Sequence, residues 1–348
     1  MNFDGVSYSK FNWNSNPFSF QILPRIFVAY EKEVTDLLTG LKNGTKFSLV
    51  SGPTGCGKTA LLKYLTTKFS SQEHIIYLPK PPKDPKDLVE IFQTHLKETT
   101  WEKLRRQKLN LYNLTEYANK KLKNKKCILF IDEAHEASME TLEWMRSLAD
   151  QINNLSVVFA GLPVLDNLLK ERLESFGKRV SLKFELSPLN KSETVDLIKK
   201  RIQNVGGVDI SPFTMDSIKY IHEKSGGMPR DILKLCNETI KNAIEKSASL
   251  IDLEFVSENL EAVDENSRRS IPVLPEKQKR ILQILQNSSL TPSEIASKID
   301  MTTYKTKAHA VRSINNLLQR LMKENLVSRK KNGKAYKYQL VQPSLTLS

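Results

Sequence analysis

Cysteine is scarce in this chain of 348 residues, which has three thiols, at Cys56, Cys127 and Cys236. They lie far apart, and no two of them have the close spacing of zinc ligands. This scarcity excludes a small secreted domain held by disulfides and gives no zinc site. We expect three buried apolar side chains in a reducing compartment.

A long hydrophobic run is also missing, since no stretch approaches the ~20 apolar residues that span a bilayer. The first residues, MNFDGVSYSKFNWNSNPF, lack the basic patch and apolar segment of a signal peptide. Hydrophobic content of 39% and charged content of 26% are ordinary for a folded globular chain. We therefore expect a cytoplasmic protein with no membrane partner.

Acidic residues are in deficit, with 39 Asp and Glu against 53 Lys and Arg, for a net charge of +14. Residues 272–342 hold 14 basic and 4 acidic side chains, so +10 of this charge lies near the C-terminal end. Such a concentration indicates a polyanionic partner. Nucleic acid is the first candidate, ahead of an anionic membrane surface.

The order of patterns along the chain predicts several domains. Short β-branched runs alternate with amphipathic stretches up to residue 189, which favours a parallel sheet covered on both faces by helices. Four helical stretches follow, beginning near Ser192, Phe213, Met228 and Leu253. A polar and then proline-containing stretch resembles an interdomain linker. We expect a three-layer α/β domain with an N-terminal extension over residues 1–189, an all-α domain over 190–263, a linker over 264–274 and a last domain over 275–342.

Residues 52–59, GPTGCGKT, fit the phosphate-binding pattern G-x-x-x-x-G-K-[ST]. The pattern lies between the predicted strand FSLV and the predicted helix ALLKYL, as its mechanism requires. Its glycines let backbone N–H groups and the helix N-terminus surround phosphates, Lys58 reaches the β and γ phosphates of ATP, and Thr59 ligates Mg²⁺. The predicted nucleotide contacts are Gly52, Pro53, Thr54, Gly55, Cys56, Gly57, Lys58 and Thr59.

The stretch CILFIDEAH supplies the acidic partner that a P-loop needs. Four apolar strand residues lead to Asp132, which would hold Mg²⁺ through water, and to Glu133, which would orient and deprotonate the attacking water. A protein that only binds nucleotide would not need Glu133, so the pair predicts ATP hydrolysis. We interpret His135 as a loop histidine that contacts its neighbours and has no part in the chemistry.

These motifs, with the strand SVVFAGLP and the segment SGGMPRDILKLC, resemble those of an AAA+ ATPase. Within that class the chain is similar to the archaeal origin-recognition-like and transposition-accessory-like group, which carries a C-terminal winged helix. The resemblance covers roughly residues 16–262. It implies a P-loop domain followed by a helical lid, and slow, regulatory hydrolysis. DEAH also occurs in superfamily-2 helicases, but too few strands follow it here for a second RecA-like sheet.

The resemblance also implies roles for single residues. Arg230, in GGMPR, matches the sensor-2 arginine that contacts the γ phosphate. Arg179 matches the arginine finger that reaches the nucleotide of a neighbouring subunit, with Arg172 as a rival, and this implies a homo-oligomer with a shared ATP site. Ile26 and Phe27 match the segment that packs on adenine.

Two stretches depart from the family pattern. The fourth strand ends in AGLP from Ala160, where many initiators have a polar sensor-1 side chain. Ala29 and Tyr30 stand where Gly-Arg usually follows Phe-Val in the adenine segment. The first departure leaves the γ-phosphate sensor unassigned, and the second weakens the match of the base pocket.

The C-terminal stretch predicts a winged helix-turn-helix. Thr291, Pro292 and Glu294 form a helix start with a capping box, and Asn332-Gly333 is a hairpin turn between alternating strands. The third helix of such a domain enters the major groove, and the wing contacts phosphates, with Tyr336 and Tyr338 packed beneath or beside the backbone. The predicted DNA contacts are Lys305, Lys307, His309 and Arg312 on the helix and Lys330, Lys331 and Lys334 on the wing.

Two functions remain open at this point. The first is an ATPase whose nucleotide state controls how the basic winged helix engages duplex DNA, as in replication initiators. The second is a signal-transducing, STAND-like switch whose winged helix mediates protein contact or transcription control. Glu133 and the candidate finger favour the first.

Overall fold

A computed structural model of the chain describes residues 8–96, 109–123, 125–259, 275–286, 288–299, 306–323, 326–332 and 335–340. The chain divides into two compact units, residues 1–260 and 261–348. Each unit is considered by itself.

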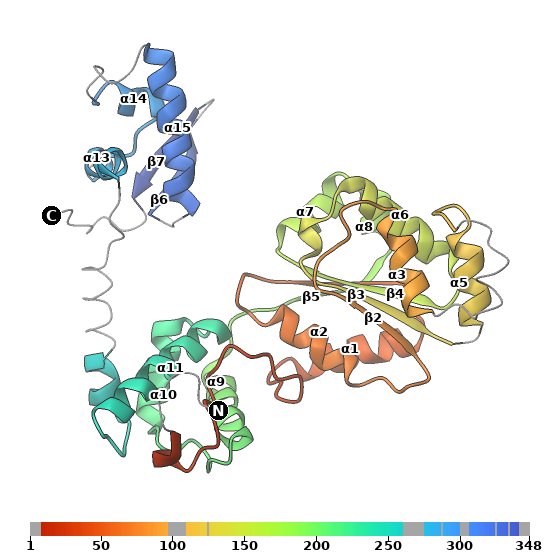
Figure 1. Cartoon of the computed structure of the whole chain (residues 1–348), viewed down its shortest axis with the longest axis horizontal. Helices are drawn as coiled ribbons and strands as arrows, with labels where there is room; N and C mark the ends of the chain where they lie inside the picture. Colours follow the sequence, from red (N-terminus) through yellow and green to blue (C-terminus); the bar gives the residue numbers. More distant parts are fainter. Residues whose placement is uncertain are drawn as a thin grey trace. The chain divides into compact units, whose positions relative to one another are not determined.

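The first unit contains the predicted parallel sheet (Figure 1). Its five strands lie in the order β2-β3-β4-β1-β5, and every neighbouring pair is parallel. Parallel strands end at the same edge, so the loops after β1 and β3 meet there. The strands are β1 (Phe47–Ser51), β2 (His74–Leu78), β3 (Cys127–Ile131), β4 (Leu155–Gly161) and β5 (Val180–Glu185).

Helices cover both faces of the sheet, because β1, β3 and β4 are buried along their whole length and need apolar partners on each side. One face packs against α1 (Glu31–Lys42) and α2 (Lys58–Thr66). The other face packs against α3 (Asp87–His95), α5 (Leu114–Leu122), α6 (Met139–Gln151), α7 (Val164–Glu171) and α8 (Glu174–Gly177). The short helix η2 (Ala134–Glu136) follows β3. The predicted three-layer α/β fold is confirmed.

The lid follows the sheet and is all helical. It comprises α9 (Lys191–Asn204), α10 (Met215–Ser225), α11 (Pro229–Glu245) and a helix over residues 253–259. Capping boxes start α9 at Asn190 and α10 at Thr214. The N-terminal segment, with η1 (Tyr8–Phe11), also packs into the lid core, where the Phe18 ring meets the Phe213 ring edge-on at 5.7 Å. The segment that leads the chain is therefore part of the lid core.

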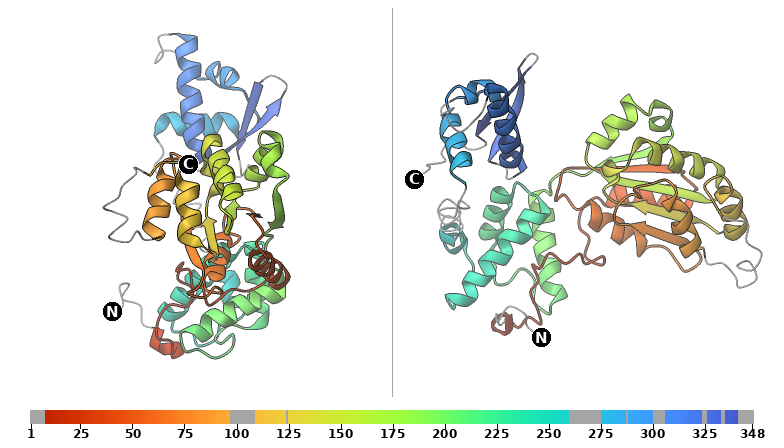
Figure 2. Two further views of the ribbon diagram at one scale, coloured as in Figure 1. Left: turned by 90° about the vertical axis from the view of Figure 1, so that its right-hand side faces the viewer. Right: turned by 45° about the horizontal axis from the view of Figure 1, so that its top comes forward.

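Within its described residues the second unit has three helices and a hairpin, the arrangement expected of a winged helix (Figure 2). The predicted capping box at Thr291 is present at the start of the second helix. Its apolar core joins all three helices to the hairpin. The elements are α13 (Glu276–Leu285), α14 (Pro292–Ala296), α15 (Lys307–Lys323), β6 (Val327–Asn332) and β7 (Ala335–Leu340), the strands being antiparallel.

Candidate nucleotide site

The P-loop leaves buried strand β1 and enters α2 through two glycines with left-handed backbone. Gly55 has φ +87° and Gly57, the N-cap of α2, has φ +103°. Only glycine adopts these angles at low cost, which is why the loop can curl around a small anion. The backbone N–H groups at the start of α2 have no intrahelical acceptor, so they and the helix dipole favour phosphate at this place.

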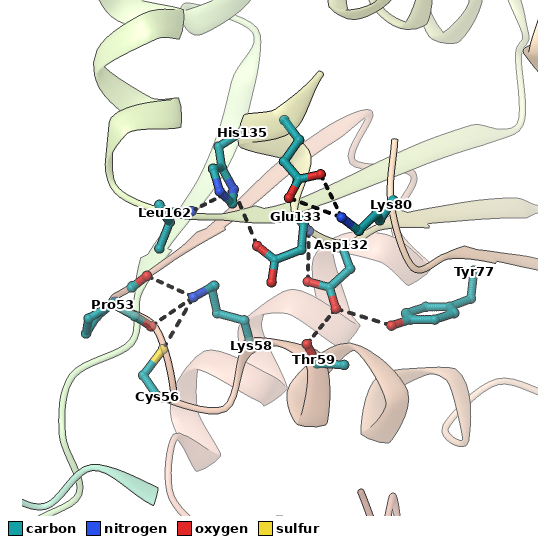
Figure 3. A network of polar contacts seen from close by, with 12 residues as sticks. Pro53, Cys56, Lys58, Thr59, Tyr77, Lys80, Asp132, Glu133, His135 and Leu162 are labelled. Carbon is teal, nitrogen blue, oxygen red and sulfur yellow. Dashed lines mark hydrogen bonds and ion pairs between the residues drawn. The ribbon is translucent and has the colours of Figure 1, made fainter. Parts of the chain in front are cut away.

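Lys58 is buried at the mouth of the loop, with 6% of its surface exposed. Its ammonium donates hydrogen bonds to the backbone oxygens of Gly52, at 2.9 Å, and Pro53, at 2.8 Å (Figure 3). A buried ammonium needs such acceptors. Neutral carbonyls are weaker partners for this charge than phosphate oxygens, so the ammonium is placed to exchange them for a bound phosphate.

Thr59 and Asp132 meet at the edge of the sheet. The Thr59 hydroxyl donates to Asp132 Oδ2 at 2.6 Å, and the Tyr77 hydroxyl donates to the same oxygen at 3.2 Å. Burial, followed by the Asp132 charge, raises the pKa of Tyr77 well above its ordinary value, so this hydroxyl stays a donor. A hydroxyl and a carboxylate are the hard oxygen ligands that Mg²⁺ takes, so the residues present fit that ion.

Glu133 follows Asp132 with left-handed backbone, φ +49°, and its N–H donates to Asp132 Oδ1 at 2.9 Å. Its carboxylate turns away from Asp132 toward His135, whose Nδ1 lies 3.5 Å from Glu133 Oε2 (Figure 3). The same Nδ1 accepts a hydrogen bond from the N–H of Leu162, at 3.4 Å, just past the end of β4. His135 thus contacts its neighbours as predicted, and one of them is the candidate base.

The lid reaches the P-loop at the start of α11. The N–H of Arg230 donates to the backbone oxygen of Gly55 at 3.3 Å. An added Cβ on Gly55 would lie 3.2 Å from the Cβ of Arg230. Arg230 and Glu133 line one cavity together with the P-loop, so the structure brings these sequence-predicted residues together.

That cavity has a volume of about 470 Å³ and extends from the P-loop to an apolar end. Ile26 and Phe27 both line it, and the Phe27 ring stacks on Tyr64 with centroids 5.1 Å apart. Ala29 and Tyr30, with φ of +69° and +59°, carry the backbone from this segment into α1. The sequence did not single out the other apolar and lid residues of the lining, Phe20, Ile22, Leu23, Val28, Leu189, Leu197, Arg201 and Leu233.

The two candidate arginine fingers, Arg179 and Arg172, do not line this cavity. Arg179, just before β5, donates to Asp150 at 2.6 Å and is half exposed. Arg172 is exposed at the C-terminal end of α7. Both guanidinium groups are on the surface, where a neighbouring subunit can approach.

In the C-terminal unit, exposed cations lie on α15 and on the hairpin, and also on α13 and just after α14. His309, Arg312 and Lys330 are exposed, and the Arg329 guanidinium lies 4.6 Å from the centre of the exposed Tyr336 ring. Lys305 and Lys334 lie outside the described residues, as do the side chains of Lys307 and Lys331.

Tyr338 corrects one expectation of the sequence. It does not stand beside a nucleic-acid backbone, because only 3% of it is exposed and it belongs to the apolar core. Tyr336 and Tyr338 share a face of β7. Tyr338 lies where the helices cover that face, whereas Tyr336 lies nearer the turn and stays 44% exposed.

Comparison with known families decides what this arrangement is. Residues 41–169 match the family model of an AAA domain. This part of the chain is thus similar to an AAA domain. It contains the P-loop, Asp132, Glu133 and His135.

Solved structures extend the likeness from the AAA domain to the fold of nearly the whole chain. The Aeropyrum pernix ORC1 protein in complex with DNA has a TM-score of 0.58 at 14% identity, with 93% of this chain and 92% of that chain covered. The Aeropyrum pernix ORC2 protein, in ADPNP and ADP complexes, has a TM-score of 0.57 at 15% identity, with 95% and 94% covered. The chain therefore shares the fold of these two ORC proteins.

Two curated relatives are similar in sequence. General secretion pathway protein A of Aeromonas hydrophila is 26% identical over 69% of this chain and 45% of its own length. An uncharacterized HTH-type transcriptional regulator of Methanocaldococcus jannaschii is 31% identical over 40% of this chain and 36% of its own length. The chain thus spans less than half the length of each. Among the described residues, no helix is both long and apolar enough to cross a membrane.

Proposed function

We propose that this chain binds and slowly hydrolyses ATP, and that the bound nucleotide controls how its basic C-terminal unit engages duplex DNA. One observation carries the nucleotide part of the proposal. The P-loop, Glu133 and Arg230 of the lid line one cavity, which continues into an apolar end lined by Ile26 and Phe27. This cavity therefore joins a phosphate-binding surface to a base-binding surface, and its size suits one nucleotide.

Different residues of the cavity would bind different parts of the nucleotide. The P-loop N–H groups and Lys58 bind the phosphates, and the apolar end takes the base without exposing it to water. Thr59 and, through water, Asp132 would hold Mg²⁺, which when bound neutralises charge on the β and γ phosphates. Arg230 would contact the γ phosphate from the lid.

Glu133 would carry the hydrolytic step. Its carboxylate takes a proton from a water whose oxygen attacks the γ phosphorus in line with the bond to the β–γ bridging oxygen. That bond breaks, ADP keeps the bridging oxygen, and inorganic phosphate leaves. Lys58 and Arg230 would offset negative charge on the phosphoryl group as it transfers.

Charge supports the DNA part of the proposal. Residues 272–342 hold +10 of the chain's net +14, and exposed cations stand on both α15 and the hairpin. One solved structure of this fold is in complex with DNA. The proposed contacts are Lys305, Lys307, His309, Arg312, Lys330, Lys331 and Lys334.

The exposed Arg179 supports a shared site. Its guanidinium is held by Asp150 in the single chain, and a neighbouring subunit with bound ATP would offer it the stronger charge of a γ phosphate. We propose Arg179 as the finger and a homo-oligomer as the active form, with Arg172 as the alternative.

A second candidate function follows from the curated relatives. One is named as a secretion-pathway protein and the other as a transcriptional regulator. In this alternative the ATPase unit is a conformational switch, and the C-terminal unit contacts a protein or acts in transcription control.

The deciding experiment measures ATP hydrolysis by the wild type, Glu133→Gln and Arg179→Ala across protein concentration, with and without random duplex DNA. We expect turnover per subunit to rise with concentration and with DNA, and both variants to bind ATP without hydrolysing it. Arg172→Ala is the control for the choice of finger. Negligible turnover in all samples, with no DNA binding, would favour the switch.

A further inference from the structure

The imidazole of His135 lies between Glu133 and the end of β4. Its Nδ1 is 3.5 Å from Glu133 Oε2 and 3.4 Å from the N of Leu162. The ring is only 17% exposed, and it follows Glu133 by two residues across the first turn of η2. Its position is therefore set by the fold.

The end of β4 makes room for this ring. Ala160 and Gly161 bring no polar side chain to this edge of the sheet. An added Cβ on Gly161 would lie 3.2 Å from His135 N and 3.4 Å from His135 Nδ1, closer than most real Cβ contacts. The His135 imidazole can therefore pack against the end of β4 because Gly161 has no side chain.

Nδ1 of His135 cannot accept a hydrogen bond from Leu162 and donate one to Glu133 at the same time. With its proton on Nε2, the ring accepts at Nδ1 from the N–H of Leu162; with its proton on Nδ1, the ring donates to the carboxylate of Glu133. The two tautomers connect the candidate base to the strand end in alternative ways. A donor on one carboxylate oxygen fixes the rotation of the group and leaves the second oxygen for water.

We propose that His135 is a positioning residue for Glu133, and that it supplies at the end of β4 the polar group that the strand itself lacks. The inference rests on the proposed hydrolysis of ATP by Glu133. It differs from a role in nucleotide binding, because His135 does not line the cavity in the described residues.

The test compares kcat, KM and the dissociation constant for ATP in four proteins: wild type, His135→Ala, His135→Asn and Glu136→Ala. We expect His135→Ala to lower kcat by about 10- to 100-fold, the size of effect that a displaced catalytic group produces. The KM and the ATP dissociation constant should stay within about twofold, because the imidazole is outside the cavity. Asparagine places an amide N–H near the position of Nδ1 and should restore most of kcat.

Glu136→Ala is the matched control, since it changes the same short helix and removes only the exposed ion pair with Lys80. It should leave kcat unchanged. Three results would overturn the inference alone: a kcat of His135→Ala equal to the wild type, a higher kcat, or a loss of ATP affinity equal to the loss of rate. A wild-type protein without turnover would instead overturn the proposed hydrolysis itself.

Discussion

At the scale of single residues, two glycines with nearly the same backbone differ in what surrounds them. Gly55 has φ +87° and Gly44 has φ +85°, but an added Cβ meets Arg230 at 3.2 Å in the first case and nothing within 4 Å in the second. A side chain added at either position would therefore be strained by the left-handed backbone. Of these two positions, only Gly55 would bring an added side chain against the lid.

We predict that Gly55→Ala lowers ATP affinity by about tenfold or more, whereas Gly44→Ala leaves it unchanged. Both substitutions should lower the free energy of unfolding by about 1–2 kcal/mol, the cost of a Cβ in this backbone region. Titration calorimetry with ATP and urea unfolding measure the two quantities. Equal affinities of the two variants would contradict the prediction.

Tyr30 gives a prediction about pH. Burial raises the pKa of Tyr30 to about 12, against a lowering contribution from a hydrogen bond with the side chain of Ser187. The Tyr30 hydroxyl also donates a hydrogen bond to the backbone oxygen of Ser187. The unfolded chain has the ordinary value near 10, so between the two values the unfolded state releases the proton first. The stability that the neutral hydroxyl contributes is present below pH 10 and is lost as the pH rises through 12.

Urea unfolding of the wild type and Tyr30→Phe at several pH values checks this. Near pH 8 the variant should be less stable by about 1 kcal/mol, the worth of a typical hydrogen bond. The difference should shrink as the pH rises above 10, because phenylalanine has no proton to lose. A difference that stays constant up to pH 11.5 would show that Tyr30 does not titrate as inferred.

Sequence reasoning found the site residues whose roles are local. Lys58 and Thr59 follow from eight contiguous letters, and Asp132 and Glu133 follow from the strand before them. The contact of Tyr77 with Asp132 could not be found in this way, because it depends on β2 and β3 being neighbours in the sheet. The same holds for the approach of Leu162 to His135.

At the scale of elements, the chain passes closely at the junction between the sheet and the lid. The N–H of Leu189, just after β5, donates to the backbone oxygen of Gly227 at 2.8 Å. Gly227 has φ +73°, and an added Cβ would collide with the carbonyl of Leu189. Gly226, with φ +58°, has open space around it.

We predict that Gly227→Ala lowers the free energy of unfolding by about 2–4 kcal/mol, because it adds a backbone collision to left-handed strain. Gly226→Ala should cost only about 1–2 kcal/mol from the strain. Urea unfolding of the two variants side by side gives the comparison. A cost for Gly226→Ala as large as that for Gly227→Ala would show that the junction has room.

The elements themselves were largely predictable. Continuous apolar runs predicted all five strands, and the capping residues at Thr291 and Pro292 predicted the start of α14. Patterns alone did not reveal that the N-terminal segment completes the lid core, because the lid residues that Trp13 and Phe18 pack among, such as Phe213, are far away in sequence. Nor did they separate lid residues that face the cavity, such as Leu197, from lid residues that only fill the core.

At the scale of the whole molecule, charge is the property that most limits the choice of partner. If the C-terminal unit binds duplex DNA through phosphates, its affinity should fall steeply with salt, since each phosphate contact releases counterions. We predict that Lys330→Ala and Arg312→Ala each reduce the slope of log affinity against log salt by about 1.

Lys83→Ala, an exposed substitution in the first unit, is the control and should leave that slope unchanged. Fluorescence anisotropy with a labelled random duplex at several salt concentrations gives the slopes. Binding that does not respond to salt, or no binding by any of the proteins, would contradict phosphate contacts and favour the alternative function.

The packing of the N-terminal segment into the lid has a consequence for synthesis. Asn16 pairs with Asn237 across 221 positions of the chain. At ~5–20 residues per second, a ribosome needs roughly 10–45 s to make the second partner after the first. During that interval Trp13 and Phe18 have emerged without the helices that cover them. These side chains therefore stay uncovered long after they are made, so this segment is where we expect chaperones to act on the nascent chain.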